Sequence, residues 1–385
     1  MRDFTSKKIK EIKPSGIRKF FDIASSIEDC VSLGVGEPDF DTPWHITEEG
    51  IYALEQGRTF YTSNQGMPQL REEISKYSKR KYNLDYSKEE IIVTCGGSEA
   101  IDIALRACIN PEDEVIILEP CYVCYAPDVE LAGGVVKTIR LKNENEFRLT
   151  PEELEEAITA KTKILILNYP NNPTGAIMPK EDLEKLVPII IKHDLLVISD
   201  EIYSELTYEG KHCSIASLEG MRDRTLTING FSKAFSMTGW RLGYVMGPSV
   251  IMEQVKKIHQ FVIMCASTPS QYAGIEALRN GDKDVEKMRE EYDRRRHYLL
   301  SEFKRLGLPC FEPKGAFYIF PDISKYQMSS EEFATDLLQK QHVVVVPGTA
   351  FGESGEGFVR ISYAYSFDAL KEAIRRIEKY LKTNF

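Results

Sequence analysis

The sequence predicts an α/β protein with a mostly parallel central sheet, helices on both faces of that sheet, and a smaller α+β domain. Short β-branched runs alternate with helix-like segments through the middle of the chain. These runs are apolar at successive positions, as in strands buried on both faces, and such strands are largely parallel. At 385 residues the chain is also too long for one small core.

The predicted strands of the central sheet share four or five consecutive, mostly apolar residues followed by a polar or glycine-containing segment. They are residues 91–95, 115–118, 164–167, 195–199 and 225–229. Ligands of open parallel sheets bind outside the carboxyl ends of the strands. We therefore look for the site in the segments that follow these runs.

A long helical pattern from about Asp282 to Leu306 connects this region to further predicted strands at residues 314–320, 343–346 and 357–362. The basic run within the helix is interpreted as a solvated face. We expect three parts: an N-terminal segment (1–45) packing with the small domain, a large cofactor-binding domain (46–280) and a small C-terminal domain (281–385).

The composition argues against several partners. The 59 acidic residues exceed the 49 Lys and Arg, and the net charge of −10 disfavours nucleic acid. The longest apolar runs are far shorter than a membrane span, and the charged N-terminus lacks an apolar signal core, so we expect a cytoplasmic protein. The eight cysteines form no disulfide framework, and the Cys121/Cys124 pair lacks the further ligands of a zinc site, so we expect no metal.

Residues 229–244 (NGFSKAFSMTGWRLGY) are the most informative segment. Lys233 follows a predicted strand, and Arg241 comes eight positions later. A lysine amine can form a Schiff base with a carbonyl cofactor, and an arginine fork suits a phosphate. Pyridoxal phosphate carries both groups on one ring.

Other segments fit such a ligand, although each also has a simpler interpretation. Residues 96–100 (GGSEA) open a helix after a strand, which forms either a phosphate site or a capped turn. They match neither the P-loop nor the dinucleotide fingerprint, which disfavours a dehydrogenase. Asp200 ends a strand, where a buried carboxylate needs a partner. Arg360 lies in an apolar strand and needs an anion, in either a structural ion pair or a substrate clamp.

Together these segments resemble the class I and II aminotransferases, which are pyridoxal-phosphate enzymes of fold type I. Matching motifs follow the family order from Gly34 to Arg360, closest to the archaeal and thermophile-type branch of aromatic and aspartate aminotransferases. The resemblance implies the fold-type-I transferase fold, pyridoxal 5′-phosphate as cofactor and Lys233 as its Schiff-base lysine.

The resemblance also assigns roles around the cofactor ring. Asp200 would pair with the pyridine nitrogen, so that the ring can accept electrons from a carbanion. Asn172, in residues 171–175 (NNPTG), and Tyr203 would hydrogen-bond the ring phenolate. Tyr122 would stack on the ring. Without the resemblance, the NNPTG segment is simply a good turn and Tyr122 an ordinary core aromatic.

The remaining implied roles concern the phosphate and the substrate. The residues expected at the phosphate are Ser98, Glu99 and Ala100 (the last two through backbone amides), Ser232, Arg241 and Tyr61. Tyr61 would reach the phosphate of the neighbouring subunit, which implies a homodimer with composite sites. Gly36, Asn172 and Arg360 would bind the substrate, with Arg360 clamping its α-carboxylate.

The sequence departs from the family pattern at two positions. Many members have Ser or Thr where this chain has Gly230, so Ser232 or another group would supply that phosphate contact. Some aspartate-specific relatives carry a Lys on the helix after the GGS run, and we place the corresponding position at Ala107. The N-terminal residues Ile17, Phe20 and Phe21 resemble a mobile apolar lid over the substrate side chain.

The sequence therefore predicts ping-pong transamination of an L-amino acid, aromatic or broad in range, with 2-oxoglutarate as acceptor. The Lys233 amine would move the α-proton. Apolar pockets discriminate weakly, so aspartate is the alternative donor. A C–S β-lyase shares the same early chemistry and remains a rival. A regulator built on this fold would carry an added DNA-binding domain, which the chain does not show.

Overall fold

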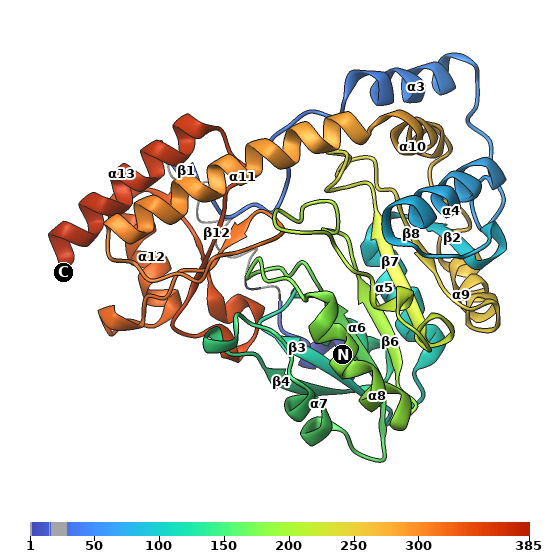
Figure 1. The fold of residues 1–385 in the computed structure, drawn as a ribbon, viewed down its shortest axis with the longest axis horizontal. Helices are drawn as coiled ribbons and strands as arrows, with labels where there is room; N and C mark the ends of the chain where they lie inside the picture. Colours follow the sequence, from blue (N-terminus) through green and yellow to red (C-terminus); the bar gives the residue numbers. More distant parts are fainter. Residues whose placement is uncertain (1, 15, 17–28) are drawn as a thin grey trace.

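The computed structural model describes residues 2–14, 16 and 29–385 (Figure 1). The expected lid residues Ile17, Phe20 and Phe21 lie outside this part. At the centre is a seven-stranded sheet in the order β2-β8-β7-β6-β5-β3-β4. Its strands are β2 (Ile91–Thr94), β3 (Glu114–Glu119), β4 (Val135–Arg140), β5 (Thr162–Asn168), β6 (Leu196–Asp200), β7 (Thr225–Gly230) and β8 (Gly243–Met246).

Neighbouring strands of this sheet run parallel, except that β8 is antiparallel to both β2 and β7. The prediction of a mostly parallel α/β sheet is confirmed. Sequence reasoning had not anticipated β4 or β8. The first is an edge strand with only one buried residue, and the second follows the Lys233 segment after a short loop.

Helices cover both faces of the sheet because its strands are apolar on both sides. In β5, Ile164 and Ile166 pack on one face while Leu165 and Leu167 pack on the other. The first face is covered by α5 (Gly96–Cys108), α6 (Tyr125–Ala132) and α9 (Ser249–Val262). The second is covered by α7 (Pro151–Ala157), α8 (Lys180–Lys192), α4 (Pro68–Tyr82) and α10 (Thr268–Asn280).

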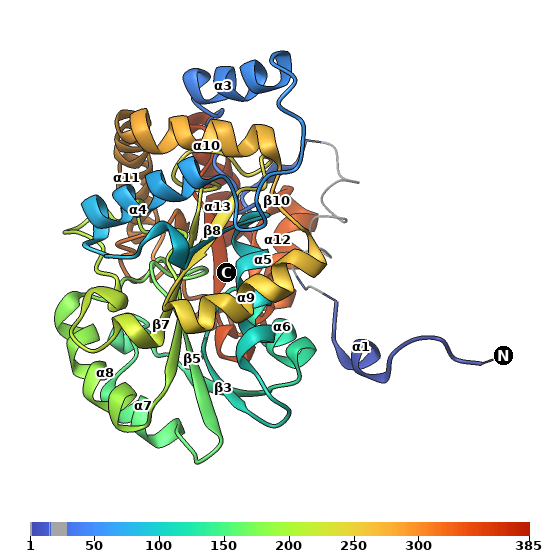
Figure 2. The ribbon, with the colours of Figure 1, turned by 90° about the vertical axis from the view of Figure 1, so that its right-hand side faces the viewer.

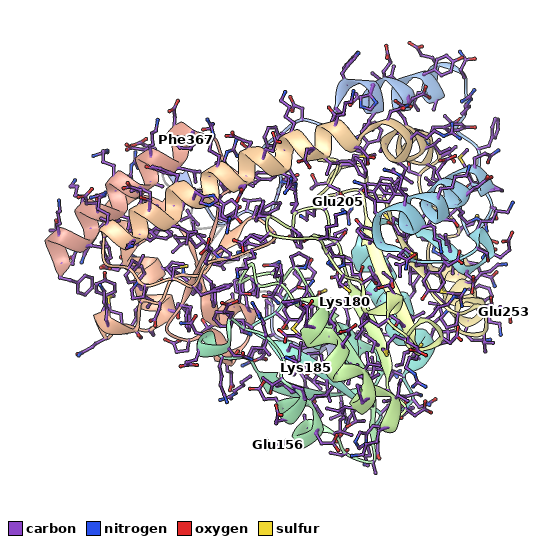
Figure 3. All side chains as sticks on the ribbon, viewed as in Figure 1. Glu156, Lys180, Lys185, Glu205, Glu253 and Phe367 are labelled. Carbon is purple, nitrogen blue, oxygen red and sulfur yellow. The ribbon has the colours of Figure 1, made fainter. Side chains whose placement is uncertain are left out.

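The outer surface of these helices is polar. Glu156 on α7 and Lys180 and Lys185 on α8 are exposed, and Glu156 lies at the lower edge of the molecule in Figure 3. The same helix α8 buries Leu183, Leu186 and Ile190 against the sheet. This division of polar and apolar faces at helical spacing explains why α8 forms against the sheet.

The long helix α11 (Asp282–Arg305) leads from α10 toward the C-terminal part of the chain (Figure 1). That part contains a three-stranded antiparallel sheet in the order β11-β12-β9, and its strand β10 pairs in parallel with β1 (Val31–Ser32) from the N-terminal segment. Its own elements are β9 (Tyr318–Ile319), β10 (Val343–Val344), β11 (Val346–Pro347), β12 (Val359–Ser362), α12 (Ser330–Gln341) and α13 (Phe367–Asn384).

The remaining elements are short or peripheral. They are α1 (Lys7–Glu11), α3 (Trp44–Glu55) and the 3₁₀ turns η1 (Lys88–Glu90), η2 (Asn143–Asn145), η3 (Ile215–Ser217), η4 (Arg222–Arg224), η5 (Ser324–Tyr326), η6 (Gly348–Phe351) and η7 (Glu353–Gly355). Residues 2–14, including α1, extend away from the body of the molecule in Figure 2. Among the described residues, no helix combines the length and apolarity needed to cross a membrane.

The sheet brings the predicted site segments together. Asn168 at the end of β5 lies opposite Asp200 at the end of β6, and β7 ends at Gly230, three residues before Lys233. The antiparallel strand β8 begins at Gly243, opposite Gly230. These polar residues therefore meet at one edge of the sheet, as expected for the carboxyl ends of parallel strands.

The junction of β8 with α5 depends on a glycine. A Cβ at Gly243 would lie 2.6 Å from the carbonyl carbon of Gly96 and 2.7 Å from the amide nitrogen of Gly97. We expect Gly243→Ala to lower the free energy of unfolding by about 1–3 kcal/mol, because backbone atoms must shift to admit the methyl group.

Denaturant unfolding measures this effect, with Gly239→Ala as the matched control. A Cβ at Gly239 would have no atom within 4 Å. Equal stability of the two variants would contradict the proposed close approach of β8 to α5.

Candidate active site

A cavity of about 380 Å³ opens at the carboxyl edge of the sheet, between the central sheet and the C-terminal strands. Its lining includes most of the predicted site residues. They are Gly36, Ser98, Tyr122, Asn172, Asp200, Tyr203, Ser232, Lys233, Arg241 and Arg360. These residues are spread over more than 300 positions of the sequence, so the fold assembles them.

Lys233 lies in the loop after β7 with its amine pointing into the cavity. Its Nζ donates a hydrogen bond to the Gly36 carbonyl oxygen at 2.6 Å and lies 5.8 Å from the centroid of the Tyr203 ring. Burial lowers the pKa of Lys233 to about 8, while Glu37 opposes the shift and the Arg360 and Arg241 cations reinforce it. The neutral, nucleophilic form of this amine is therefore more populated near neutral pH than that of an ordinary lysine.

Asp200 provides the buried carboxylate. Tyr125 donates its hydroxyl to Oδ2 at 2.6 Å, and the backbone amide of Ile202 donates to Oδ1 at 3.2 Å. Burial raises the pKa of Asp200 to about 6, and the Tyr125 hydrogen bond partly offsets that rise. The carboxylate is thus poised to pair with a cationic or protonated group in the cavity.

The cavity lining also includes groups that favour an anion. Gly97 and Ser98 lie in the first turn of α5, where free amides and the helix dipole favour negative charge. The Arg241 guanidinium packs against Gly96, since a Cβ there would lie 2.7 Å from Nη2. Its Nη1 donates to the Thr238 carbonyl oxygen at 3.0 Å. A fixed guanidinium beside a helix N-terminus suits a phosphate.

Arg360 is a buried cation without a carboxylate partner among the described residues. It is 2% exposed, and its guanidinium carbon lies 4.4 Å from the Tyr318 ring centroid and 4.7 Å from that of Phe351. Nη1 donates to the Asn172 side-chain oxygen at 2.9 Å, Nη2 donates to the Gly34 carbonyl, and Nε has no partner among those residues. Such a cation needs an anionic ligand.

The remaining predicted residues surround these groups. The hydroxyls of Tyr203 and Tyr318 are 2.7 Å apart, and the Asn172 backbone amide donates to the Asn168 side chain at 3.2 Å. Burial raises the pKa of Tyr122 to about 12, so this phenol is neutral. Gly36 leaves no room for a side chain because its Cβ would collide with the Tyr318 hydroxyl.

Some predicted residues occupy other places. Ala100 is fully buried, and the Glu99 side chain points to Cys95 and His259, which leaves only their backbones for a ligand. Tyr61 is 82% exposed and does not line the cavity of its own chain.

The placement of a distal-carboxylate position at Ala107 was wrong. Ala107 lies in the last turn of α5, whereas the cavity meets the first turn. At 1.5 Å per residue the two ends are roughly 16 Å apart, too far for a side chain there to contact a substrate in the cavity.

The packing also explains Gly230. A Cβ at this position would lie 3.1 Å from the Gly243 Cα and 3.1 Å from the Leu242 carbonyl oxygen. The close pairing of β7 with β8 therefore leaves little room for the Ser or Thr that the family pattern led us to expect here. Ser232 lines the cavity two residues later.

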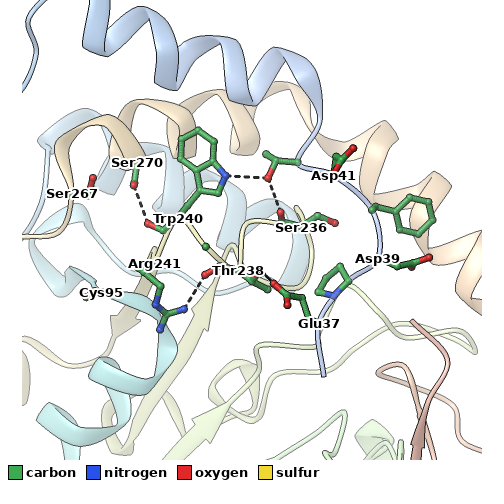
Figure 4. A pocket seen from close by; sticks show the side chains of 14 residues that line it. Glu37, Asp39, Asp41, Cys95, Ser236, Thr238, Trp240, Arg241, Ser267 and Ser270 are labelled. Atoms are coloured by element: carbon green, nitrogen blue, oxygen red, sulfur yellow. Dashed lines mark hydrogen bonds between the residues drawn. The ribbon is translucent and has the colours of Figure 1, made fainter. Parts of the chain in front are cut away.

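A second cavity of about 820 Å³ adjoins the first at Glu37, Thr238 and Arg241 (Figure 4). In this view the Trp240 indole donates to the Thr42 hydroxyl at 3.0 Å, and the Ser270 hydroxyl donates to the Trp240 carbonyl at 2.9 Å. The Arg241 guanidinium thus lies between the two cavities.

The sequence model of the family described as "Aminotransferase class I and II" matches residues 28–377 of this chain. The chain belongs to the class I and II aminotransferases. Two relatives that are named as aminotransferases match nearly the whole chain, and each alignment covers 98% of both sequences. They are the aspartate aminotransferase of Pyrococcus abyssi, at 48% identity, and the aromatic-amino-acid aminotransferase 2 of Thermococcus litoralis, at 46%.

A solved structure agrees with this assignment. The aromatic aminotransferase from Pyrococcus horikoshii superposes on the present aminotransferase with a TM-score of 0.91 at 46% identity, covering 95% of this chain and 99% of that one. The fold is therefore that of the pyridoxal-phosphate aminotransferases. The enzyme is a transaminase, and its cofactor is pyridoxal 5′-phosphate.

The residues of the aminotransferase cavity fit this cofactor. The Lys233 amine, the Asp200 carboxylate and the Arg241 guanidinium line one cavity, and they match in kind the aldehyde, ring nitrogen and phosphate of pyridoxal phosphate. The described residues contain no cluster of three or more metal-ligating side chains.

Sequence reasoning missed two tyrosines. Tyr125 hydrogen-bonds Asp200, and Tyr318 contacts both Tyr203 and Arg360. Tyr125 lies three residues after Tyr122 in the same segment, which gave a weak signal. Tyr318 lies in an apolar strand that gave none, because an aromatic residue there is equally expected in a core.

The lowered pKa predicts the reactivity of Lys233. In the cofactor-free protein, reductive methylation of this amine should reach half its maximal rate near pH 8, since only the neutral amine attacks an aldehyde. Peptide mass spectrometry over a pH series measures the rate for each lysine.

Lys76 is the internal control for this measurement. Its exposed ammonium pairs with Glu72 and Glu73, which raises its pKa. Methylation of Lys76 should therefore increase only at higher pH. Parallel profiles for the two lysines would contradict the burial effect at Lys233.

Proposed function

We propose that this aminotransferase transfers the amino group of an L-amino acid, aromatic or broad in range, to 2-oxoglutarate, with Lys233 as the Schiff-base lysine. The observation that carries the proposal is Arg360. This buried guanidinium has no carboxylate partner among the described residues and faces the cavity that Lys233 also lines. The α-carboxylate shared by amino acids and 2-oxo acids supplies the missing anion.

The residues around Arg360 orient the substrate. Asn172 and the Gly34 carbonyl hold the guanidinium from two sides, and the Tyr318 ring supports its face. A carboxylate bound by this fixed fork is held in one orientation, which brings the substrate α-carbon toward the Lys233 amine. The missing Cβ at Gly36 lets its backbone pack against the Tyr318 hydroxyl within the same cavity.

Lys233 then acts as the base. With its pKa lowered to about 8, the Lys233 amine can take the α-proton of the substrate and donate it to a carbon of the bound cofactor. Bound pyridoxal phosphate supplies the electron sink for this proton transfer. In the same cavity, Asp200 supplies a carboxylate and Arg241 a guanidinium for oppositely charged groups of the ligand.

The cavity lining supports an aromatic or broad substrate range. The cations that line it are Lys233, Arg241 and Arg360, and each already has a role. Among the described residues no further cation lines the cavity to bind a second carboxylate, while Val35, Ile101 and Ile202 add apolar surface. Aspartate remains the second candidate donor, because the Pyrococcus abyssi relative carries that name.

The half-reactions test the activity and the donor together. The purified enzyme should show the visible absorbance band of lysine-bound cofactor. An amino acid donor should remove this band, and 2-oxoglutarate should restore it. We expect tyrosine to act at lower concentration than aspartate.

The Lys233→Ala variant is the control for the spectrum and should lack the band. A greater response to aspartate would favour the second candidate. A band that 2-oxoglutarate fails to restore, with pyruvate and ammonia released from a cysteine conjugate, would replace transamination by β-elimination.

We further infer a homodimer with composite sites. Exposed apolar side chains gather on α3 and the following loop, including Trp44, Leu54, Phe60 and Tyr61. Single exposed apolar residues are ordinary, but a concentrated group of them indicates an interface. The second cavity beside Arg241 (Figure 4) could receive Tyr61 of a partner subunit.

We also propose the domain division at residues 45/46 and 280/281, with Gly281 between α10 and α11.

Subunit mixing tests the composite site. We expect Tyr61→Ala and Lys233→Ala homodimers each to have low activity. In a hybrid of the two variants, one site would carry both substitutions and the other would carry neither. Coexpression of the two chains should therefore restore activity, measured on the hybrid isolated with two affinity tags.

The matched control replaces Tyr61→Ala by Asp200→Ala, because Asp200 lines the same cavity as Lys233 within one chain. That hybrid should remain inactive. Equal recovery in both hybrids, or recovery in neither, would contradict the role of Tyr61.

A further inference from the structure

A carboxylate lies within the proposed phosphate site. Glu99 is in the first turn of α5, directly after Ser98, whose side chain lines the cavity. A carboxylate and a phosphate at the same helix end have like charges, and they compete for the same dipole and amides. The side chain of Glu99 therefore has to be kept away from a bound phosphate.

Two hydrogen bonds hold the Glu99 carboxylate in place. Oε2 accepts the backbone amide of Cys95, the residue before α5. Oε1 is hydrogen-bonded to Nδ1 of His259 at 2.6 Å. The first bond satisfies an amide that the helix leaves free, while Gly97 and Ser98 face the cavity.

Glu99 is the one hydrogen-bond partner of the His259 side chain among the described residues. It lies in the last turn of α9, 160 residues from Glu99 in the sequence, and its side chain is fully buried. Nε2 has no hydrogen-bond partner among the described residues. A carboxylate oxygen can only accept, so Nδ1 is the donor in the hydrogen bond to Glu99.

We propose that His259 is a positioning residue for the cofactor phosphate. Its Nδ1–H fixes the Glu99 carboxylate on the Cys95 amide, so that the carboxylate cannot turn toward the cavity amides. This inference rests on the proposed phosphate site at α5. It assigns to α9 a function in cofactor binding, although α9 lines neither cavity.

The proposal separates a charge effect from packing. If His259 only fills space, its replacement should weaken the binding of any ring that occupies the cavity. If His259 restrains Glu99, its replacement should weaken binding only for a ligand that carries a phosphate, and only while Glu99 carries its charge. Pyridoxal, which lacks the phosphate, is therefore the matched ligand, and Glu99→Gln is the matched second substitution.

The experiment titrates the full cofactor-stripped chain with pyridoxal phosphate and with pyridoxal, and measures the two dissociation constants by absorbance. For His259→Leu we expect pyridoxal phosphate to bind ~10–100-fold more weakly, as for a lost hydrogen bond to a charged group. The affinity for pyridoxal should stay unchanged. Adding Glu99→Gln to His259→Leu should restore most of the affinity for pyridoxal phosphate.

A pair of polar variants covers the case in which His259→Leu does not fold. The amide nitrogen of His259→Asn can take the place of Nδ1 and should retain binding, whereas His259→Gln extends past that place and should lose it. Equal weakening of both ligands, no recovery with Glu99→Gln, or equal behaviour of the Asn and Gln variants would overturn the role of His259. Equal affinity of the unmodified chain for both ligands would instead refute the phosphate site itself.

Discussion

Strands β5, β6 and β7 run parallel and end together, and this register decides where the reactive side chains lie. Asn168 lies opposite Asp200, and the chain leaves β7 three residues before Lys233. The glycine-rich pairing of β7 with β8 then brings Arg241 back to the start of α5. A shift of one residue in any of these strands would turn these side chains to the other face of the sheet.

The site concentrates charged groups that burial disfavours. The Lys233 amine has a pKa lowered to about 8, the Asp200 carboxyl has a pKa raised to about 6, and Arg360 is buried without a counter-ion among the described residues. Each of these groups costs stability in the empty protein. Each also matches a charge or an electrophile on the cofactor or the substrate, so that ligand binding offsets the cost.

The residues that hold the site side chains in place come from different parts of the chain. Tyr125 bonds Asp200 from α6, Tyr318 supports Arg360 from β9, and His259 holds Glu99 from α9. Sequence reasoning assigned a role to none of these three residues, although Tyr125 lies in the same segment as Tyr122. They carry no reactive pattern of their own, and each acts only through the residue that it holds in place.

The sequence by itself determined the fold class through its local patterns, and the resemblance of its motifs to a known family implied the family and the cofactor. Apolar runs mark strands, a polar residue after each run marks the edge of the sheet, and Lys233, Asp200 and Arg360 stand out against their neighbours. Only the tertiary structure decided that Arg360 lacks a counter-ion, that burial lowers the pKa of Lys233, and that Ala107 lies away from the cavity. These properties depend on contacts between residues far apart in the chain. Glu99 and His259, for example, are 160 positions apart. Local sequence patterns do not show which distant residues come into contact.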